Sequence, residues 1–257
     1  MQCPFGSADE NALARCLIRP ILRGGDTGPT PDTLPSVLQG LIGQPMGVDV
    51  VKLKQFLIDN GIGETSIGGP VEQDVTRARF LVIHDTSSPE IHEASFPVNI
   101  NQKEWSGNKL SNWLNSATPT HVFVNRAGES AAKANFKTIV TATKYEAGKD
   151  VPAGPARQEA RNRRRGLFLH IEMIQPRRRS HPGSSYFDIP PSPGFSQAQL
   201  DRLALLFVVA SVRSGHWLLP AFHASIDATS ADAHDDPQDF DLESWLDSVR
   251  TLLARLI

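Results

Sequence analysis

Two histidines, His84 and His223, each stand directly after a short apolar run, at the point where a strand would end. Asp236 follows His223 by 13 residues, in the segment "HDDPQDF", and stands immediately before a proline. Two imidazoles and one carboxylate suit a borderline cation such as Zn²⁺ and leave one coordination position open for water. Because an open position distinguishes a catalytic zinc from a structural one, these residues predict one catalytic Zn²⁺ per chain.

A fourth residue, Glu172, is an acidic side chain inside the apolar segment "GLFLHIEMI". In a strand, Glu172 would share one face with Phe168 and His170. An ionised carboxylate is costly in such surroundings unless it has a partner or a chemical task. Beside a metal-bound water it can act as a general base. The alternative is a structural ion pair with one of the many arginines that flank this segment.

The elements that must position these residues follow a mixed α/β pattern from residue 79 onward. The segments "RFLVIH", "THVFVNRAGES", "GLFLHIEMI" and "HWLLPAFH" predict strands, the second of them with a hairpin turn at Ala127 and Gly128. Ser196 and Gln199 form a capping-box pattern before a long apolar helix, and Asp241 can cap the last helix. We therefore expect a mixed central β-sheet flanked by helices.

The first part of the chain differs in composition from the rest. Residues 1–75 contain a loop rich in glycine and proline and a helix candidate, "VVKLKQFLIDN", that Asp49 can cap. We predict a small, mostly helical N-terminal unit over residues 1–75 and a zinc domain over residues 76–257. Cys3 and Cys16 leave two alternatives open, a local disulfide or two free thiols.

Composition and charge exclude several classes of function. The 257 residues are 40% hydrophobic, which is enough for a sizeable core. The net charge of −2 provides no general attraction for nucleic acid, and we expect no nucleic-acid partner. No apolar run approaches the ~20 residues of a membrane helix, so we expect no transmembrane segment. The N-terminus lacks the basic and apolar pattern of a signal peptide.

Five motifs, spread from about residue 79 to 245, together resemble the zinc-dependent N-acetylmuramoyl-L-alanine amidase superfamily. That superfamily includes AmpD-type enzymes, phage lysozyme-like amidases and peptidoglycan recognition proteins. The resemblance lies in the order of the motifs more than in any single one. In chain order they are "FLVIHDTS", "THVFVNRAGES", "GLFLHIEMI", "PGFSQAQLDRLALLF" and "PAFHASID" followed by "HDDPQDF".

The resemblance implies a role for each residue of the site. His84, His223 and Asp236 correspond to the zinc ligands, and Glu172 corresponds to the catalytic acid and base. His234 stands where AmpD-type enzymes carry a lysine that stabilises the oxyanion. An imidazolium can donate the same hydrogen bond only while it is protonated, so this role would depend on pH.

Three further residues are expected around the metal rather than on it. Thr86 matches the "IHxT" pattern of the family and is expected to donate a hydrogen bond near the site. His121 is placed beside the site by the resemblance, and His170 shares a strand face with Glu172. We expect these three residues to contact substrate or to support the ligands.

The function implied by the resemblance is hydrolysis of the amide between N-acetylmuramic acid and L-alanine. The substrate would be peptidoglycan or a soluble muropeptide. We expect an antibacterial effector or lysin that a signal-independent route, such as type VI secretion, delivers to the periplasm of target cells. An effector would have a cognate immunity protein.

Three alternatives stay open at this point. The first is a cytoplasmic amidase that recycles cell-wall fragments. The second is a binding module of the same fold that does not cleave, although such modules typically lack one ligand and all three candidates are present here. The third is an unrelated zinc peptidase or other hydrolase, which is disfavoured because no H-E-x-x-H helix motif occurs.

Overall fold

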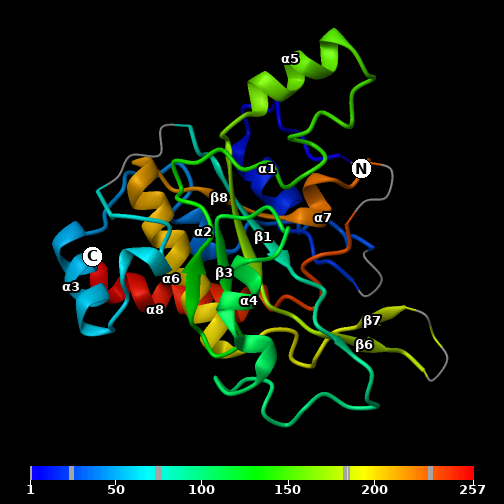
Figure 1. The fold of residues 1–257 in the computed structure, drawn as a ribbon. Coiled ribbons are helices and arrows are strands. Elements are labelled where there is room, and N and C mark those ends of the chain that lie inside the picture. Colours follow the sequence, from blue (N-terminus) through cyan, green and yellow to red (C-terminus); the bar gives the residue numbers. More distant parts are fainter. Residues whose placement is uncertain (1, 23–25, 73–76, 182–183, 185, 231–233) are drawn as a thin grey trace.

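The computed structural model describes residues 2–22, 26–72, 77–181, 184, 186–230 and 234–257, and it has a mixed α/β fold (Figure 1). Its centre is a five-stranded sheet in the order β4-β3-β5-β1-β8. The predicted mixed α/β class is therefore confirmed. The strands are β1 (Phe80–Asp85), β3 (Val122–Val124), β4 (Ser130–Ala132), β5 (Phe168–Met173) and β8 (Leu219–Phe222).

Parallel pairing in the middle of the sheet brings the predicted site residues His84, Glu172 and His223 to one edge. β1 runs parallel to both β5 and β8, β3 runs parallel to β5, and β4 pairs with β3 in the antiparallel direction across the predicted turn. Every residue of β1 and β5 is buried, as in strands covered on both faces. In this register His84 lies opposite Glu172.

Two long helices, α6 (Gln197–Ser214) and α8 (Leu242–Leu256), lie side by side in Figure 1. Ser196 and Gln199 form the predicted capping box at the start of α6, and Asp241 caps α8 through the backbone N–H of Ser244. Residues 203–211 of α6 are all buried, as the apolar sequence predicts. In the part of the chain that the structure describes, no helix combines the length and apolar character needed to cross a bilayer.

The N-terminal helices share the hydrophobic core of the sheet. They are α1 (Glu10–Leu17), α2 (Ser36–Gln39) and α3 (Val50–Asp59), and Asp49 caps α3 as predicted. Buried side chains such as Leu17 and Leu53 belong to the same apolar cluster as β1 and α6. The predicted boundary between residues 75 and 76 lies outside the described residues, so the division into two units stays a prediction.

Of the two alternatives for Cys3 and Cys16, the structure contains the disulfide. It links the segment before α1 to Cys16 within that helix. The sulfur of Cys3 also approaches the carbonyl oxygen of Ser225, near the strand end that carries His223. The N-terminal segment is thereby linked covalently to α1 and lies against α7.

The remaining elements surround the sheet and include several that the sequence pattern does not predict. The fourth predicted strand ends one residue early, because His223 begins a short helix in which Asp227 N–H donates to the His223 carbonyl. The arginine-rich segments form a helix and a strand of a second, three-stranded sheet. These elements are β2 (Glu90–Ile91), α4 (Leu110–Leu114), α5 (Pro155–Arg164), β6 (Arg177–Arg179), β7 (Phe187–Ile189) and α7 (His223–Ile226), with single 3₁₀ turns at η1 (Glu64–Ser66) and η2 (Ser106–Asn108).

Candidate metal centre

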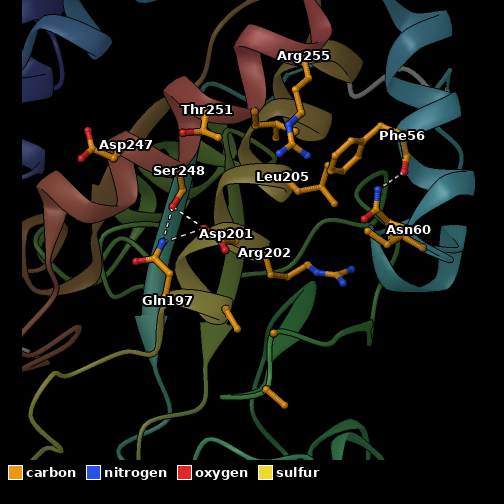
Figure 2. Close-up of a pocket in the computed structure, with 15 residues that line it drawn as sticks. Phe56, Asn60, Gln197, Asp201, Arg202, Leu205, Asp247, Ser248, Thr251 and Arg255 are labelled. Atoms are coloured by element: carbon orange, nitrogen blue, oxygen red, sulfur yellow. Dashed lines mark hydrogen bonds between the residues drawn. The ribbon is translucent and has the colours of Figure 1, made fainter.

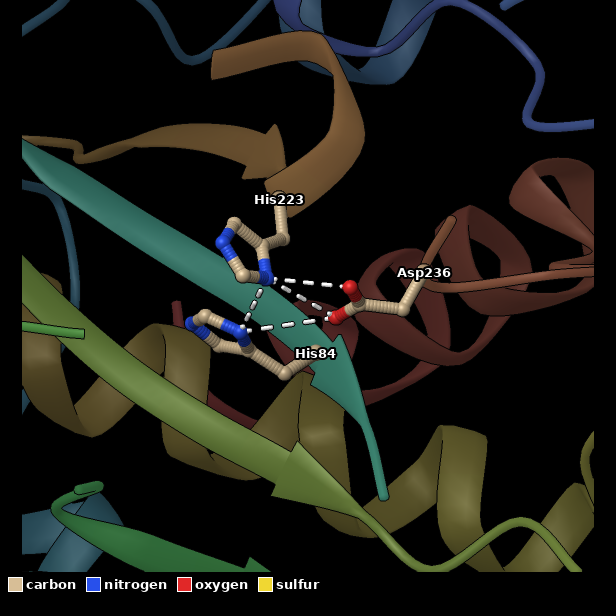
Figure 3. Close-up of side chains that lie close together, drawn as sticks. All are labelled: His84, His223 and Asp236. Carbon is tan, nitrogen blue, oxygen red and sulfur yellow. Dashed lines mark hydrogen bonds and ion pairs between the residues drawn. The ribbon is translucent and has the colours of Figure 1, made fainter. Parts of the chain in front are cut away.

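His84, His223 and Asp236 converge on one point at the carboxyl edge of the sheet (Figure 3). His84 lies near the end of β1, His223 begins α7 directly after β8, and Asp236 comes from the segment that precedes α8. The two Nδ1 atoms of the histidines are 3.0 Å apart. Nδ1 of His84 lies 3.4 Å from Oδ2 of Asp236, and Nδ1 of His223 lies 3.0 Å from Oδ1. All three side chains are buried.

These separations fit a small divalent cation. Tetrahedral ligands at zinc bond lengths of about 2.0–2.1 Å stand roughly 3.3–3.4 Å from one another. With Oδ2 of Asp236 as the single carboxylate ligand, the three separations are 3.0, 3.4 and 3.2 Å, close to that edge length. Two imidazole nitrogens and a carboxylate also form a donor set that borderline transition metals accept. The structure thus brings together a buried group that can hold a metal ion, as the sequence predicts.

The electrostatics of the metal-free site favour one positive charge at its centre. Burial and the nearby charge of His223 lower the pKa of His84 to about 3, so His84 is neutral and its lone pair is available. Burial alone would lower the pKa of His223, but Asp236 and Asp227 raise it to about 10. Burial would likewise raise the pKa of Asp236, yet the charge and hydrogen bond of His223 lower it overall. These shifts favour a positive charge on His223, between the carboxylates of Asp227 and Asp236.

Both histidines are also held through their outward ring nitrogens. Nε2 of His223 lies 3.1 Å from Oδ2 of Asp227. Nε2 of His84 lies 3.0 Å from Nδ1 of His170, whose own Nε2 lies 3.0 Å from Oε2 of Glu146. This last contact has the distance of an ion pair, although its angle is not that of a hydrogen bond. His170 is therefore placed behind a candidate ligand, consistent with the supporting position predicted for it.

Glu172 lies beside the candidate metal position. Its Oε1 is 3.9 Å from Nδ1 of His84, and its buried Oε2 has no hydrogen-bond partner among the described residues. Burial, followed by the charges of Asp236 and Asp85, raises the pKa of Glu172 well above its ordinary value. The alternative of a structural ion pair with arginine is not observed among the described residues. A carboxyl group with one oxygen lacking a hydrogen-bond partner among the described residues, next to a candidate cation site, is available for proton transfer.

His234 stacks on His223 at the exposed side of the site. Their ring centroids are 4.2 Å apart, and Nδ1 of His234 lies 3.8 Å from Oδ1 of Asp236. About half of the His234 side chain is exposed. Burial of the remainder and the charge of His223 lower the pKa of His234 below 6.5. Of the site residues, His234 is thus the one placed to contact a substrate from solvent.

Thr86 and His121 form hydrogen bonds with backbone groups rather than with the candidate metal ligands. Oγ1 of Thr86 donates to the carbonyl of Ser88 and accepts from the N–H of Gln175, which joins the ends of β1 and β5. Nδ1 of His121 accepts the backbone N–H of His170, and Nε2 lies 3.0 Å from the carbonyl of Thr138. Both nitrogens of His121 are thereby used, so His121 is not a ligand in this arrangement.

A buried ion pair fixes the segment that carries Asp236. Arg177 bonds both carboxylate oxygens of Asp85, at 2.8 and 2.6 Å. The Asp85 carboxylate also accepts from the backbone N–H of Gln238, and the Asp85 N–H donates to Asp236. The sequence reasoning missed Arg177, because arginines on this stretch look like surface residues. It also missed Asp227 and Glu146; only Asp227 has a local signal, its helical spacing of four residues from His223.

A pocket of about 440 Å³ lies elsewhere, between α3, α6, α8 and the β3–β4 turn (Figure 2). Its walls include Phe56 and Leu205, with Arg202 and Arg255 among the polar side chains. At one end, Ser248 bonds Asp201 and Gln197. None of the candidate metal ligands lines this pocket, so its shape says nothing about the chemistry of the buried site.

Comparisons with protein-family models, with curated proteins and with solved structures found no match to this chain. A function can therefore be argued only from the motif resemblance and from the geometry of the site.

Proposed function

We propose that this chain is a zinc-dependent amidase that hydrolyses the amide between N-acetylmuramic acid and L-alanine of peptidoglycan. The observation that carries the proposal is the buried group of His84, His223 and Asp236, with the Glu172 carboxyl group beside it, whose Oε2 has no hydrogen-bond partner among the described residues. This donor set is typical of catalytic zinc sites, which keep a fourth position open. The order of the five motifs supplies the substrate class.

The residues around the site would divide the work of hydrolysis. A zinc ion held by the three ligands would supply Lewis acidity, which polarises a carbonyl and acidifies water. Glu172 would accept a proton from the attacking water and return it to the leaving amine. The raised pKa of Glu172 suits its role as the acid that protonates the leaving amine. A divalent cation in place of the proton on His223 would favour the ionised Glu172 carboxylate, which is the form that accepts a proton from water. His234 would donate to the developing oxyanion.

We infer a site of action outside the cytoplasm, as an effector or lysin that reaches the periplasm of target cells. The disulfide between Cys3 and Cys16 supports this inference, because disulfides persist in oxidising compartments and are rare in the cytosol. An effector of this kind would be paired with an immunity protein in the producing cell. A cytoplasmic recycling enzyme would have no use for the disulfide, which makes it the second candidate.

The decisive experiment is product analysis with intact sacculi and with soluble anhydro-muropeptides. The zinc-loaded protein should release stem peptides whose N-terminal residue is L-alanine, identified by mass. Glu172→Gln should keep its zinc and lose turnover by several orders of magnitude, whereas Glu129→Gln, a carboxylate of the β3–β4 turn, should retain activity. Cleavage of soluble fragments alone would favour recycling. Binding to sacculi without any product would favour a non-catalytic module and refute the amidase.

A further inference from the structure

The loop of residues 142–146 contacts one carboxylate and contains another. Asp227, bound by the loop, faces His223, and Glu146, within the loop, faces His84 through His170. The backbone N–H groups of Lys144 and Tyr145 donate to Asp227, at 2.8 and 2.9 Å. Glu146, in the same loop, lies against His170, which contacts His84. We propose that Asp227 and Glu146 are positioning residues of the metal centre, so that the 142–146 loop orients both ligand histidines at once.

The first arm of this arrangement acts on His223. Both oxygens of Asp227 already accept backbone N–H groups, and Oδ2 also faces Nε2 of His223 at 3.1 Å. A carboxylate so surrounded can only accept, so Nε2 of His223 must carry a proton. The nitrogen left for a metal is then Nδ1, which is the atom that faces His84 and Asp236. Asp227 thus selects both the ring orientation and the tautomer of this ligand.

The second arm reaches His84 through His170. Oε2 of Glu146 accepts from the N–H groups of Ala142 and Thr143 and from Oγ1 of Thr143. This oxygen lies 3.0 Å from Nε2 of His170, outside hydrogen-bond geometry, and its negative charge favours the tautomer of His170 that carries the proton on Nε2. Nδ1 of His170 then carries a lone pair and accepts a hydrogen bond from Nε2–H of His84. This leaves the lone pair on Nδ1 of His84 free for a metal. The opposite arrangement would put a proton on Nδ1 of His84 and block coordination.

The loop is itself anchored from outside the site. The ring of Tyr145 stacks on Phe5 with centroids 4.2 Å apart, and the guanidinium of Arg164 lies 3.5 Å from the centre of the same ring. Arg164 also makes a two-point ion pair with Asp150. These contacts hold the loop without touching either histidine, which provides a matched control for the positioning effect.

The test measures zinc affinity of the full-length protein by competition with a chromogenic chelator, together with the visible d–d spectrum of the Co²⁺ form. Asp227→Asn and Glu146→Gln should each weaken zinc binding by about 10–100-fold and change the Co²⁺ spectrum, because outer-sphere partners of ligating histidines typically have effects of this size. Asp150→Asn removes a carboxylate that pairs with Arg164 and should leave affinity within about twofold. Thr143→Val removes one donor to the Glu146 carboxylate and the acceptor of the Glu146 N–H, and it should give a smaller loss in a protein of unchanged charge.

Circular dichroism of the metal-free variants establishes which of them fold, and only folded variants are compared. Wild-type affinity and an unchanged Co²⁺ spectrum in the folded variants of Asp227, Glu146 and Thr143 would overturn the proposal. An equal loss in Asp150→Asn would overturn it too, because the effect would then be general loosening of the loop. The inference rests on the metal site of the proposed function but not on its substrate. A wild-type protein that binds zinc and cleaves no peptidoglycan would refute the amidase and leave this inference standing.

Discussion

The raised pKa of His223 predicts that this ring carries a second proton when no metal is bound, and this proton should control how metal binding depends on pH. Burial alone would lower the pKa of His223, but the carboxylates of Asp236 and Asp227 raise it from 6.5 to about 10. These carboxylates lie 3.0 and 3.1 Å from the two ring nitrogens. The metal-free protein should therefore carry an imidazolium at neutral pH, where an unperturbed histidine is mostly neutral.

The magnitude follows from the size of this shift. A metal must displace the proton on Nδ1 of His223, so binding at pH 7 works against roughly three pH units, or about 4 kcal/mol at ~1.36 kcal/mol per unit. Apparent zinc affinity should rise at least about tenfold for each pH unit between 7 and 9. The stability of the metal-free fold has the opposite trend. Its contribution from this proton is full below pH 6.5 and is lost as pH rises towards 10, because the folded state binds the proton more tightly.

The assay is a nitrogen NMR titration of the metal-free protein, combined with chelator competition across the same pH range. The His223 ring, assigned with the His223→Gln variant, should remain doubly protonated at pH 8, while the ring of His84 should be neutral throughout. His216→Gln, which changes an exposed histidine, should leave both results unchanged. A neutral His223 ring at pH 8, with zinc affinity independent of pH above 7, would refute the reasoning.

Three further predictions concern other parts of the molecule. His234→Lys should keep a higher fraction of its hydrolytic activity at pH 8 than the wild type does, because the lowered pKa of His234 leaves little imidazolium there; equal pH–rate profiles would contradict this. Replacing Cys3 and Cys16 by serine should lower the free energy of unfolding by about 3 kcal/mol in urea denaturation, since the disulfide closes a short loop of the unfolded chain. Arg177→Met should cost about 3–5 kcal/mol by the same measurement, because it leaves the buried Asp85 carboxylate unpaired, and a loss below 1 kcal/mol would count against a structural ion pair.

The sequence was sufficient for those features that short-range patterns encode. The capping box of Ser196 and Gln199 and the cap at Asp241 depend on residues three positions apart, and both occur as predicted. Apolar runs predicted the strands, and strand ends predicted that His84 and His223 would meet. This last inference succeeds because parallel neighbouring strands end at the same edge of a sheet. Residues that end such strands are therefore close in space, even when they are far apart in the sequence.

The groups that support the ligands could not be predicted in the same way, because no local pattern relates them to the site. Glu146 reaches His84 only through His170, across a turn whose fold depends on contacts with the N-terminal segment and with α5. The pairing of Asp85 with Arg177 spans 92 residues and is buried, although arginine clusters usually lie at surfaces. If the proposed positioning by the 142–146 loop holds, a chain that keeps the three candidate ligands should still lose metal affinity when this loop changes. For this site, short motifs predicted the three candidate ligands, whereas the contacts that orient their ring nitrogens come from segments distant in the sequence.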